Sequence, residues 1–263
     1  MAKPSPDSLL EVYGLSKAFG GVRATNHINL ILRRGELRCI IGPNGAGKST
    51  LFKLLMGMIM PDSGTVVFEG RNVTRAQPHL RARLGIGIKL QKMGVYPGLT
   101  VRHNMLVPLY HQRAGQDPDV QIRQLLQPLR LDGKIDRVVG NLSHGERQWL
   151  AIGMALAMKP RLLLLDEPTA GMDPEETHAT CELIRSLNAE GMTVLVTEHD
   201  MAFVRQLQSP ITVMHFGAVL AEGSLADIEQ HAEVRRIYLG HGTPRRLLQP
   251  RAARGFLGSA RHG

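Results

Sequence analysis

The chain contains 263 residues, of which 43% are hydrophobic and 21% charged. A chain of this length can bury a sizeable core, which excludes a small scaffold held together by disulfides or zinc. Lysine and arginine outnumber aspartate and glutamate by 32 to 23, for a formal net charge of +9, and this excess suggests an anionic partner such as a nucleotide, a nucleic acid or a membrane surface. The two cysteines are too few for a disulfide framework, and Cys39, in the apolar run LRCII, is interpreted as a buried core residue.

Targeting and membrane-spanning patterns are absent from the sequence. The N-terminal residues MAKPSPDSLL lack the apolar core of a signal peptide, and no segment approaches the roughly 18 uninterrupted apolar residues of a membrane span. We therefore expect a cytoplasmic protein that reaches a membrane only from the side.

The first third of the chain predicts short strands around one glycine-rich loop. Strands are expected over 9–15, 24–32 and 36–41, separated by glycine pairs and turns. The third strand runs into GPNGAGKST and then into a helix whose apolar residues recur at helical spacing. That apolar face comprises Leu51, Leu54, Leu55 and Met58, and the turn at 61–64 is expected to end the helix before a strand at 65–70.

The remainder predicts a helical insert followed by alternating strands and helices. Residues 92–158 have mixed polarity and amphipathic stretches, which indicates a mostly helical segment. Apolar strands alternating with helices then imply a largely parallel, buried sheet. The expected elements are strands at 161–166 and 193–197, a helix capped by Asp173, a short helix at 201–208 and a hairpin about Gly217. Residues 241–263 carry five arginines and no acidic residue, and are expected to form a flexible tail.

The nonapeptide that follows the third strand has the pattern of a phosphate-binding loop. Its glycines allow the backbone N–H groups to wrap a phosphate, and the N-terminus of the next helix adds positive potential. Lys48 can reach the β- and γ-phosphates of a nucleotide, and the hydroxyl of Ser49 can ligate Mg²⁺. An exposed glycine-rich turn is the alternative, which the flanking strand and helix disfavour. The loop comprises Gly42, Pro43, Asn44, Gly45, Ala46, Gly47, Lys48, Ser49 and Thr50.

A second apolar strand ends in two carboxylates, Asp166 and Glu167. An acidic turn after a strand is common and can be no more than a solvated surface feature. Beside a phosphate loop, however, Asp166 can hold the water shell of Mg²⁺, and Glu167 can polarise the water that attacks the γ-phosphate. The pair therefore predicts phosphoryl transfer from a nucleotide to water.

The segment LSHGE, which includes Ser143, His144, Gly145 and Glu146, precedes another helix and is in isolation only a helix cap. In the order GPNGAGKS, LSHGE, LLLLDEP, AGMD and TEHD, however, the motifs resemble those of the ATPase subunit of ABC transporters over about residues 9–240. The resemblance implies an α/β P-loop NTPase with a RecA-like core, an N-terminal antiparallel β subdomain and a helical subdomain at about 92–158. It also implies two cofactors, ATP and Mg²⁺.

The same resemblance implies roles for further residues and a second subunit. Two such cassettes close head to tail over two ATP molecules, so the LSHGE segment, with His144 in place of the usual second glycine, would act on the nucleotide of the partner. The remaining matches are Phe19 as the aromatic that stacks on adenine, Gln91 as a Mg²⁺-contacting glutamine, His199 as the switch histidine on the γ-phosphate and Asp173 as a residue that communicates across the dimer. A buried core residue is the alternative for Phe19.

Finer similarity extends to bacterial importers of branched-chain amino acids and of urea and short amides. It rests on stretches such as RLGIG, LSHGERQWLAIGMALA, EHDMAFVR and VLAEGSL. It implies a second ATPase subunit, identical or different, transmembrane permease subunits that dock near 91–101, and indirectly a periplasmic binding protein. The chain would lie on the cytoplasmic face of the inner membrane. Two departures from the urea type, Asp173 and the basic tail, leave the transported substrate open.

Two other function classes compete with transport. A soluble ABC ATPase acting on nucleic acid or ribosomes would suit the positive charge, but such proteins usually carry a long coiled-coil insertion or two cassettes, and this chain has neither. A non-catalytic scaffold subunit would not need both Glu167 and His199. We therefore expect a transport ATPase with no nucleic-acid partner.

Overall fold

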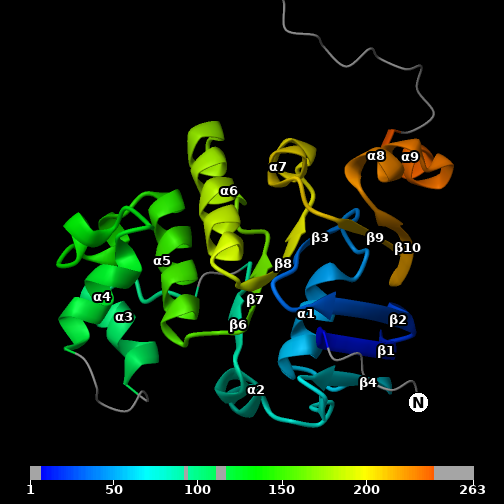
Figure 1. The fold of residues 1–263 in the computed structure, drawn as a ribbon, viewed down its shortest axis with the longest axis horizontal. Helices are drawn as coiled ribbons and strands as arrows, with labels where there is room; N and C mark the ends of the chain where they lie inside the picture. The colour runs from blue at the N-terminus through cyan, green and yellow to red at the C-terminus, as the bar shows by residue number, and fades with distance from the viewer. Residues whose placement is uncertain (1–6, 92–93, 111–116, 240–263) are drawn as a thin grey trace, which may run out of the picture.

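The computed structural model describes residues 7–91, 94–110 and 117–239. Its strands form two sheets (Figure 1). The smaller sheet is antiparallel, in the order β2-β1-β4-β5, with β1 Ser8–Phe19, β2 Val22–Arg33, β4 Ser63–Phe68 and β5 Arg71–Asn72. The larger has the order β10-β9-β3-β8-β7-β6, with β3 Leu37–Ile41, β6 Ile86–Lys89, β7 Leu162–Asp166, β8 Thr193–Glu198, β9 Ile211–His215 and β10 Ala218–Gly223.

The larger sheet is parallel except at one edge. Strands β9, β3, β8, β7 and β6 pair in parallel, while β10 closes an antiparallel hairpin on β9. Both faces of β7 are buried. Successive side chains of a strand point to opposite faces, and each set of β7 side chains packs into a different core cluster. Leu163 and Leu165 join one core cluster, and Leu162 and Leu164 join the other. The predicted parallel, buried sheet is therefore present, and its five parallel strands all end on the same side of the sheet, called the carboxyl edge below.

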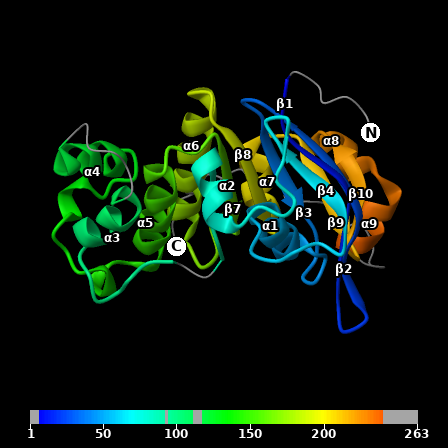
Figure 2. The same cartoon turned by 90° about the horizontal axis from the view of Figure 1, so that it is seen from below.

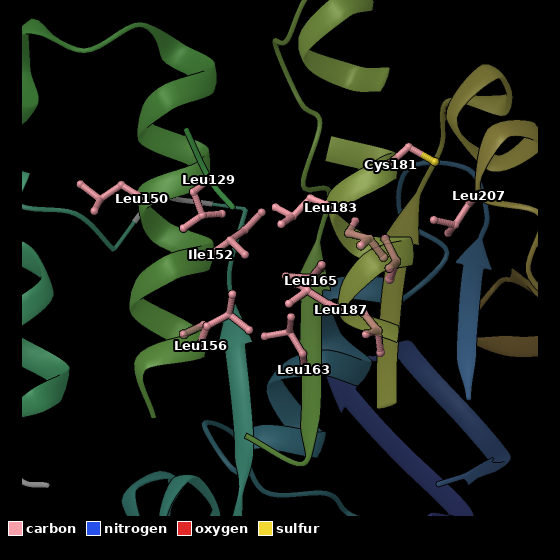
Figure 3. Close-up of a cluster of buried hydrophobic side chains, with 14 of the residues drawn as sticks. Leu129, Leu150, Ile152, Leu156, Leu163, Leu165, Cys181, Leu183, Leu187 and Leu207 are labelled. Carbon is pink, nitrogen blue, oxygen red and sulfur yellow. The ribbon is translucent and has the colours of Figure 1, made fainter. Parts of the chain in front are cut away.

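Helices cover the larger sheet on the side of the first cluster. Figure 3 shows Ile152 and Leu156 of α5 (His144–Ala157) pointing toward Leu163 and Leu165 of β7, with Leu183 of α6 (Pro174–Ala189) beside them. Each of these five side chains is less than a tenth exposed. The other face of the sheet packs against α1 (Lys48–Met56) and the antiparallel sheet, which gives a three-layered core.

The helix after the phosphate loop is shorter than the sequence predicts. It ends at Gly57, whose φ of 76° gives a left-handed cap and whose N–H bonds the carbonyls of the last turn. The predicted stop at 61–64 is therefore wrong, because Gly57 closes the helix first. Met58 lies beyond that cap and is 41% exposed, so it does not belong to the buried face formed by Leu51, Leu54 and Leu55.

Between β6 and β7 the chain forms a group of helices. They are α3 (Val101–Leu109), α4 (Pro118–Leu126), two short 3₁₀ turns, η1 (Asp132–Lys134) and η2 (Val139–Asn141), and α5, whereas α2 (Pro78–Leu84) precedes β6. Helices α3, α4 and α5 gather at one end of the molecule, as both views show (Figures 1 and 2). Helices thus occupy the segment for which the sequence predicts them.

The C-terminal half follows the predicted alternation. Asp173 caps α6 in a capping box with Glu176, and Pro174 occupies the first turn, as the sequence indicates. Helix α7 spans Met201–Leu207, and α8 (Leu225–Gln230) and α9 (Ala232–Leu239) follow the β9–β10 hairpin. Cys39 is fully buried, as expected. The predicted basic tail, 241–263, lies outside the described residues, and among those that are described no helix is long and apolar enough to cross a membrane.

Candidate nucleotide site

The glycine-rich loop joins β3 to α1 at the carboxyl edge of the parallel sheet. Gly47 adopts a φ of 100°, and a Cβ there would lie 2.1 Å from the carbonyl oxygen of Ala24, so only glycine fits. The same holds for Gly42, where a Cβ would lie 2.4 Å from Met214 O. Lys48 Nζ donates to Gly42 O at 2.6 Å and to Pro43 O at 3.3 Å. The lysine is thereby folded back over the concave backbone of its own loop.

Phe19 stands at the end of β1, where the β1–β2 hairpin turns. Its side chain is 48% exposed, so the alternative of a buried core residue is excluded. The ammonium of Lys17 lies 5.6 Å from the centre of its ring. An exposed aromatic face at this position is available to a planar ligand.

Ser49 and Asp166 approach one another from α1 and β7. Ser49 Oγ donates to Asp166 Oδ1 at 3.3 Å, and the hydroxyl of Thr197 donates to the same oxygen at 2.6 Å. Among the described residues no three histidine, cysteine or acidic side chains form a metal cluster. Mg²⁺ bound together with phosphates needs only one or two protein ligands, because phosphates and waters supply the others. The hydroxyl and carboxylate pair therefore fits such an ion.

Glu167 is held at several points. Its φ is 45°, a left-handed conformation that is costly for a residue other than glycine. Its N–H bonds both the carbonyl oxygen of Thr197, at 3.1 Å, and the hydroxyl of Thr197, at 3.2 Å. Its carboxylate accepts from Gln91 Nε2 at 2.8 Å and lies 3.5 Å from His199 Nδ1. The structure thus brings Glu167, Gln91 and His199 together, and the side-chain amide of Gln91 is hydrogen-bonded to the Glu167 carboxylate.

Several ionisable groups are buried around these residues. Lys48, Lys89, Asp166, Glu167 and Glu198 are each less than a tenth exposed. Burial lowers the pKa of Lys48, although the carboxylates of Glu167 and Asp166 act in the opposite direction. Burial likewise lowers the pKa of Lys89 to about 8. The two lysines and three carboxylates form one desolvated cluster under the phosphate loop.

The Ser143–Glu146 segment is engaged with its own chain. Ser143 caps α5 in a capping box with Glu146, which also pairs with Lys134. Ser143 Oγ lies 3.3 Å from Glu176 Oε1, and a Cβ on Gly145 would lie 2.4 Å from the Glu176 carboxylate. His144 Nε2 lies 2.8 Å from Ala170 O. These contacts join the segment to the first turn of α6 and to the loop between β7 and α6, which contains Asp173.

Three buried polar residues at this edge were not singled out in the sequence. Thr197 and Glu198 end β8, and Glu198 accepts from the N–H and hydroxyl of Thr169 at 3.2 and 2.7 Å. Lys89 ends β6 and donates to the carbonyls of Asp166 and Glu167 at 3.2 and 3.1 Å. A lysine inside the apolar run IGIKL was the available signal, since buried lysines are rare.

Known proteins resemble this chain in both sequence and fold. A family model described as ABC transporter matches residues 25–170. LivG of Salmonella typhimurium, a high-affinity branched-chain amino acid transport ATP-binding protein, is 34% identical over 88% of this chain and 98% of its own length. The Nod factor export ATP-binding protein I of Burkholderia lata is 35% identical over 89% of this chain and 77% of its own length.

Solved structures agree with the sequence relatives. The crystal structure of an ATP-binding cassette of an ABC transporter, in its ADP conformation, matches with a TM-score of 0.80 and 29% identity. The match covers 89% of this chain and 99% of that one, and it confirms the expected α/β cassette fold. Since the family model spans more than half of the chain and the relatives span nearly all of it, the chain belongs to the ABC transporter family as an ATP-binding cassette, an enzyme that hydrolyses ATP.

Proposed function

We propose that this chain powers import across a bacterial inner membrane, with Glu167 polarising the water that attacks ATP. The observation that carries the proposal is the fixed Glu167 carboxylate, which is buried between Gln91 and His199 beside the phosphate loop. Phosphoryl transfer requires mainly positioning and charge stabilisation, and a single oriented carboxylate is a sufficient base. His199, whose Nδ1 lies 3.5 Å from this carboxylate, would also bond the γ-phosphate.

The nucleotide would be held by groups from separate elements. The backbone of residues 42–50 and the ammonium of Lys48 would bind the phosphates, while Phe19 would stack on the adenine. Ser49 and Asp166 would hold Mg²⁺, which when bound neutralises phosphate charge. Gln91 would join that ion through its exposed side chain once it leaves Glu167.

A second cassette, identical or different, would complete the site. Ser143, Gly145 and Glu146 begin α5, and their contacts are with the loop and helix that follow β7 in their own chain. A hydroxyl and a helix N-terminus are suited to an anion, so we assign them to the phosphates of the opposing subunit. Asp173, at the start of α6 beside this segment, would contact the opposing subunit as well.

An apolar hollow beside the segment after Gln91 supports docking of a permease. It has a volume of about 280 Å³ and lies between the parallel sheet and the helices α3 and α5. Met56, Ile88, Val107 and Met154 are among its lining residues. A short amphipathic helix of a permease would bury its apolar face there. Of the predicted docking segment 91–101, Lys92 and Met93 lie outside the described residues.

The proposal also assigns the domains of the chain and the transported substrate. We assign 9–240 to the cassette, 92–158 to a helical subdomain and 241–263 to an appended tail. Branched-chain amino acids, or urea and short amides, are the proposed cargo, delivered by a periplasmic binding protein. The similarity to LivG supports amino acids as the cargo. A relative named for Nod factor export, however, is about as similar in sequence to this chain, so relatives of comparable identity serve different cargo.

The role of Glu167 is tested with Glu167→Gln in the full-length chain. The amide keeps the shape but cannot accept a proton from water, so we expect ATP binding at the parental affinity, turnover reduced at least ~100-fold, and accumulation of a closed dimer in ATP. Size-exclusion chromatography and phosphate release report the two effects. Turnover at the parental rate would exclude Glu167 as the base.

The transport role is tested by the partners of the purified chain. The ATPase rate should rise when permease subunits in lipid vesicles are added, and it should not respond to DNA or ribosomes. Purification with ribosomes or DNA, and without an integral membrane complex, would exclude the transport proposal in favour of a nucleic-acid ATPase.

A further inference from the structure

Lys89 is a buried cation at the edge of the parallel sheet. It ends β6, where it pairs with Leu165 of β7, and its side chain is 2% exposed. The rest of the strand is apolar or glycine. Placing an ammonium in such surroundings costs free energy unless polar groups surround it, so the groups it meets need a functional explanation.

The ammonium of Lys89 is bound by the backbone of the two acidic residues. Its Nζ lies 3.2 Å from Asp166 O and 3.1 Å from Glu167 O, and among the described residues no carboxylate oxygen pairs with it within 4.0 Å. Asp166, Glu198 and Glu167 favour its charge from a greater distance, against the effect of burial. One cation therefore holds two successive carbonyls.

These carbonyls flank the strained residue. Glu167 has a φ of 45°, a left-handed conformation that is unfavourable for a residue other than glycine. Thr197 holds its N–H, and Lys89 holds its carbonyl and the one before it. Strain of this kind persists only where surrounding contacts fix the backbone on both sides.

We propose that Lys89 is a positioning residue of the hydrolytic site, whose ammonium holds the Asp166–Glu167 backbone so that the Glu167 carboxylate faces Gln91, His199 and the attacking water. In this role Lys89 acts through the backbone of Asp166 and Glu167. The inference rests on the proposed role of Glu167. It gives a buried, charged residue of β6 a part in ATP hydrolysis.

The variant Lys89→Met distinguishes a lysine that positions Glu167 from a lysine that only stabilises the fold. Lys89→Met removes the desolvation of a buried ammonium but leaves the carbonyls of Asp166 and Glu167 without this donor, and since these two effects oppose each other, the Tm should change little. If Lys89 positions Glu167, the same variant should lose turnover. A structural lysine would instead lower Tm, ATP affinity and turnover together.

The test uses the full-length chain, with exposed Lys53→Met as the matched control. For Lys89→Met we expect kcat to fall 10- to 100-fold while KM for ATP and the Kd of a non-hydrolysable ATP analogue stay within twofold. Lys89→Gln, which keeps a neutral donor, should lose less. Parental kcat in Lys89→Met, or a Met variant faster than the Gln variant, would overturn the proposal.

A double variant separates this inference from the role of Glu167. In single-turnover measurements, adding Lys89→Met to Glu167→Gln should cause no further loss, because Lys89 acts through the missing carboxylate. A further tenfold loss would overturn the inference. If Glu167→Gln alone hydrolyses at the parental rate, the proposed function fails. If it is inactive while Lys89→Met is fully active, only the inference fails.

Discussion

The phosphate-loop region and the Ser143–Glu146 segment satisfy their polar groups in different ways. Around the phosphate loop, Lys48, Asp166 and Glu167 are buried, and their hydrogen-bond partners include residues of the loop after β3, of α1 and of β8. The Ser143–Glu146 segment instead starts a helix packed against the β7–α6 loop and α6, with Ser143 at the surface. The first region is assembled within the chain, and the second is the one that we propose acts on the ATP of an opposing subunit.

This difference implies that binding and turnover are separable. ATP affinity of a single chain should depend on residues of the first region. Turnover should depend on both regions, because in the proposed dimer a second chain would bring its own Ser143–Glu146 segment. Substitutions in the two regions should therefore move different measured quantities.

The largest effect in the second region is expected for Ser143→Glu. A carboxylate would repel the phosphates of the opposing subunit, and loss of one stabilising donor in such a site costs roughly 100-fold in turnover. Because Ser143 lies against Glu176 of its own chain, the affinity of the dilute chain for a fluorescent ATP analogue should stay within twofold.

Ser143→Thr is the matched control, since threonine keeps both the hydroxyl and the helix cap. It should retain most of the turnover. If ATP affinity of the dilute chain falls in parallel with turnover in Ser143→Glu, the two regions are not separable.

A smaller effect, on binding alone, is expected for Phe19→Ala in the first region. Stacking of a base on an aromatic side chain is worth roughly 1–3 kcal/mol, so KM for ATP should rise about 5- to 150-fold with kcat nearly constant. Phe19→Tyr, which keeps the ring, should bind at the parental affinity. If Phe19→Ala instead lowers kcat and leaves KM unchanged, Phe19 does not bind adenine.

The sequence predicts the first region better than the second because its chemistry is local. GPNGAGKS and LLLLDE each place strand, loop and functional group within a few residues, and the structure joins Ser49 to Asp166 as expected. The contacts of Lys89 and His144 carry no such signal, because they depend on how whole elements pair and pack. Lys89 reaches Glu167 only through strand pairing of β6 with β7, and His144 reaches Ala170 only through packing of α5 on the β7–α6 loop. The end of α1 was misplaced because the left-handed cap at Gly57 preceded the stronger turn signal at 61–64.

The contact of His144 with Ala170 joins the two regions. His144 Nε2 donates to Ala170 O at 2.8 Å, and the N–H of Ala170 donates to Glu167 O at 3.3 Å. The start of α5 is thereby linked to the backbone of Glu167 through one residue. If this link matters, a change in the second region should weaken turnover in the same chain without reducing ATP binding.

His144→Gly should give the smallest of these effects. Loss of one neutral hydrogen bond is worth about 0.5–1.5 kcal/mol, so kcat should fall roughly 2- to 10-fold with ATP affinity unchanged. The loss is limited because Gln148 Nε2 also lies 3.4 Å from Ala170 O. His79→Gly, the same substitution at an exposed residue in the first turn of α2, controls for the weakening of a helix start. Equal effects of the two substitutions on kcat would show that the link through Ala170 does not contribute to turnover.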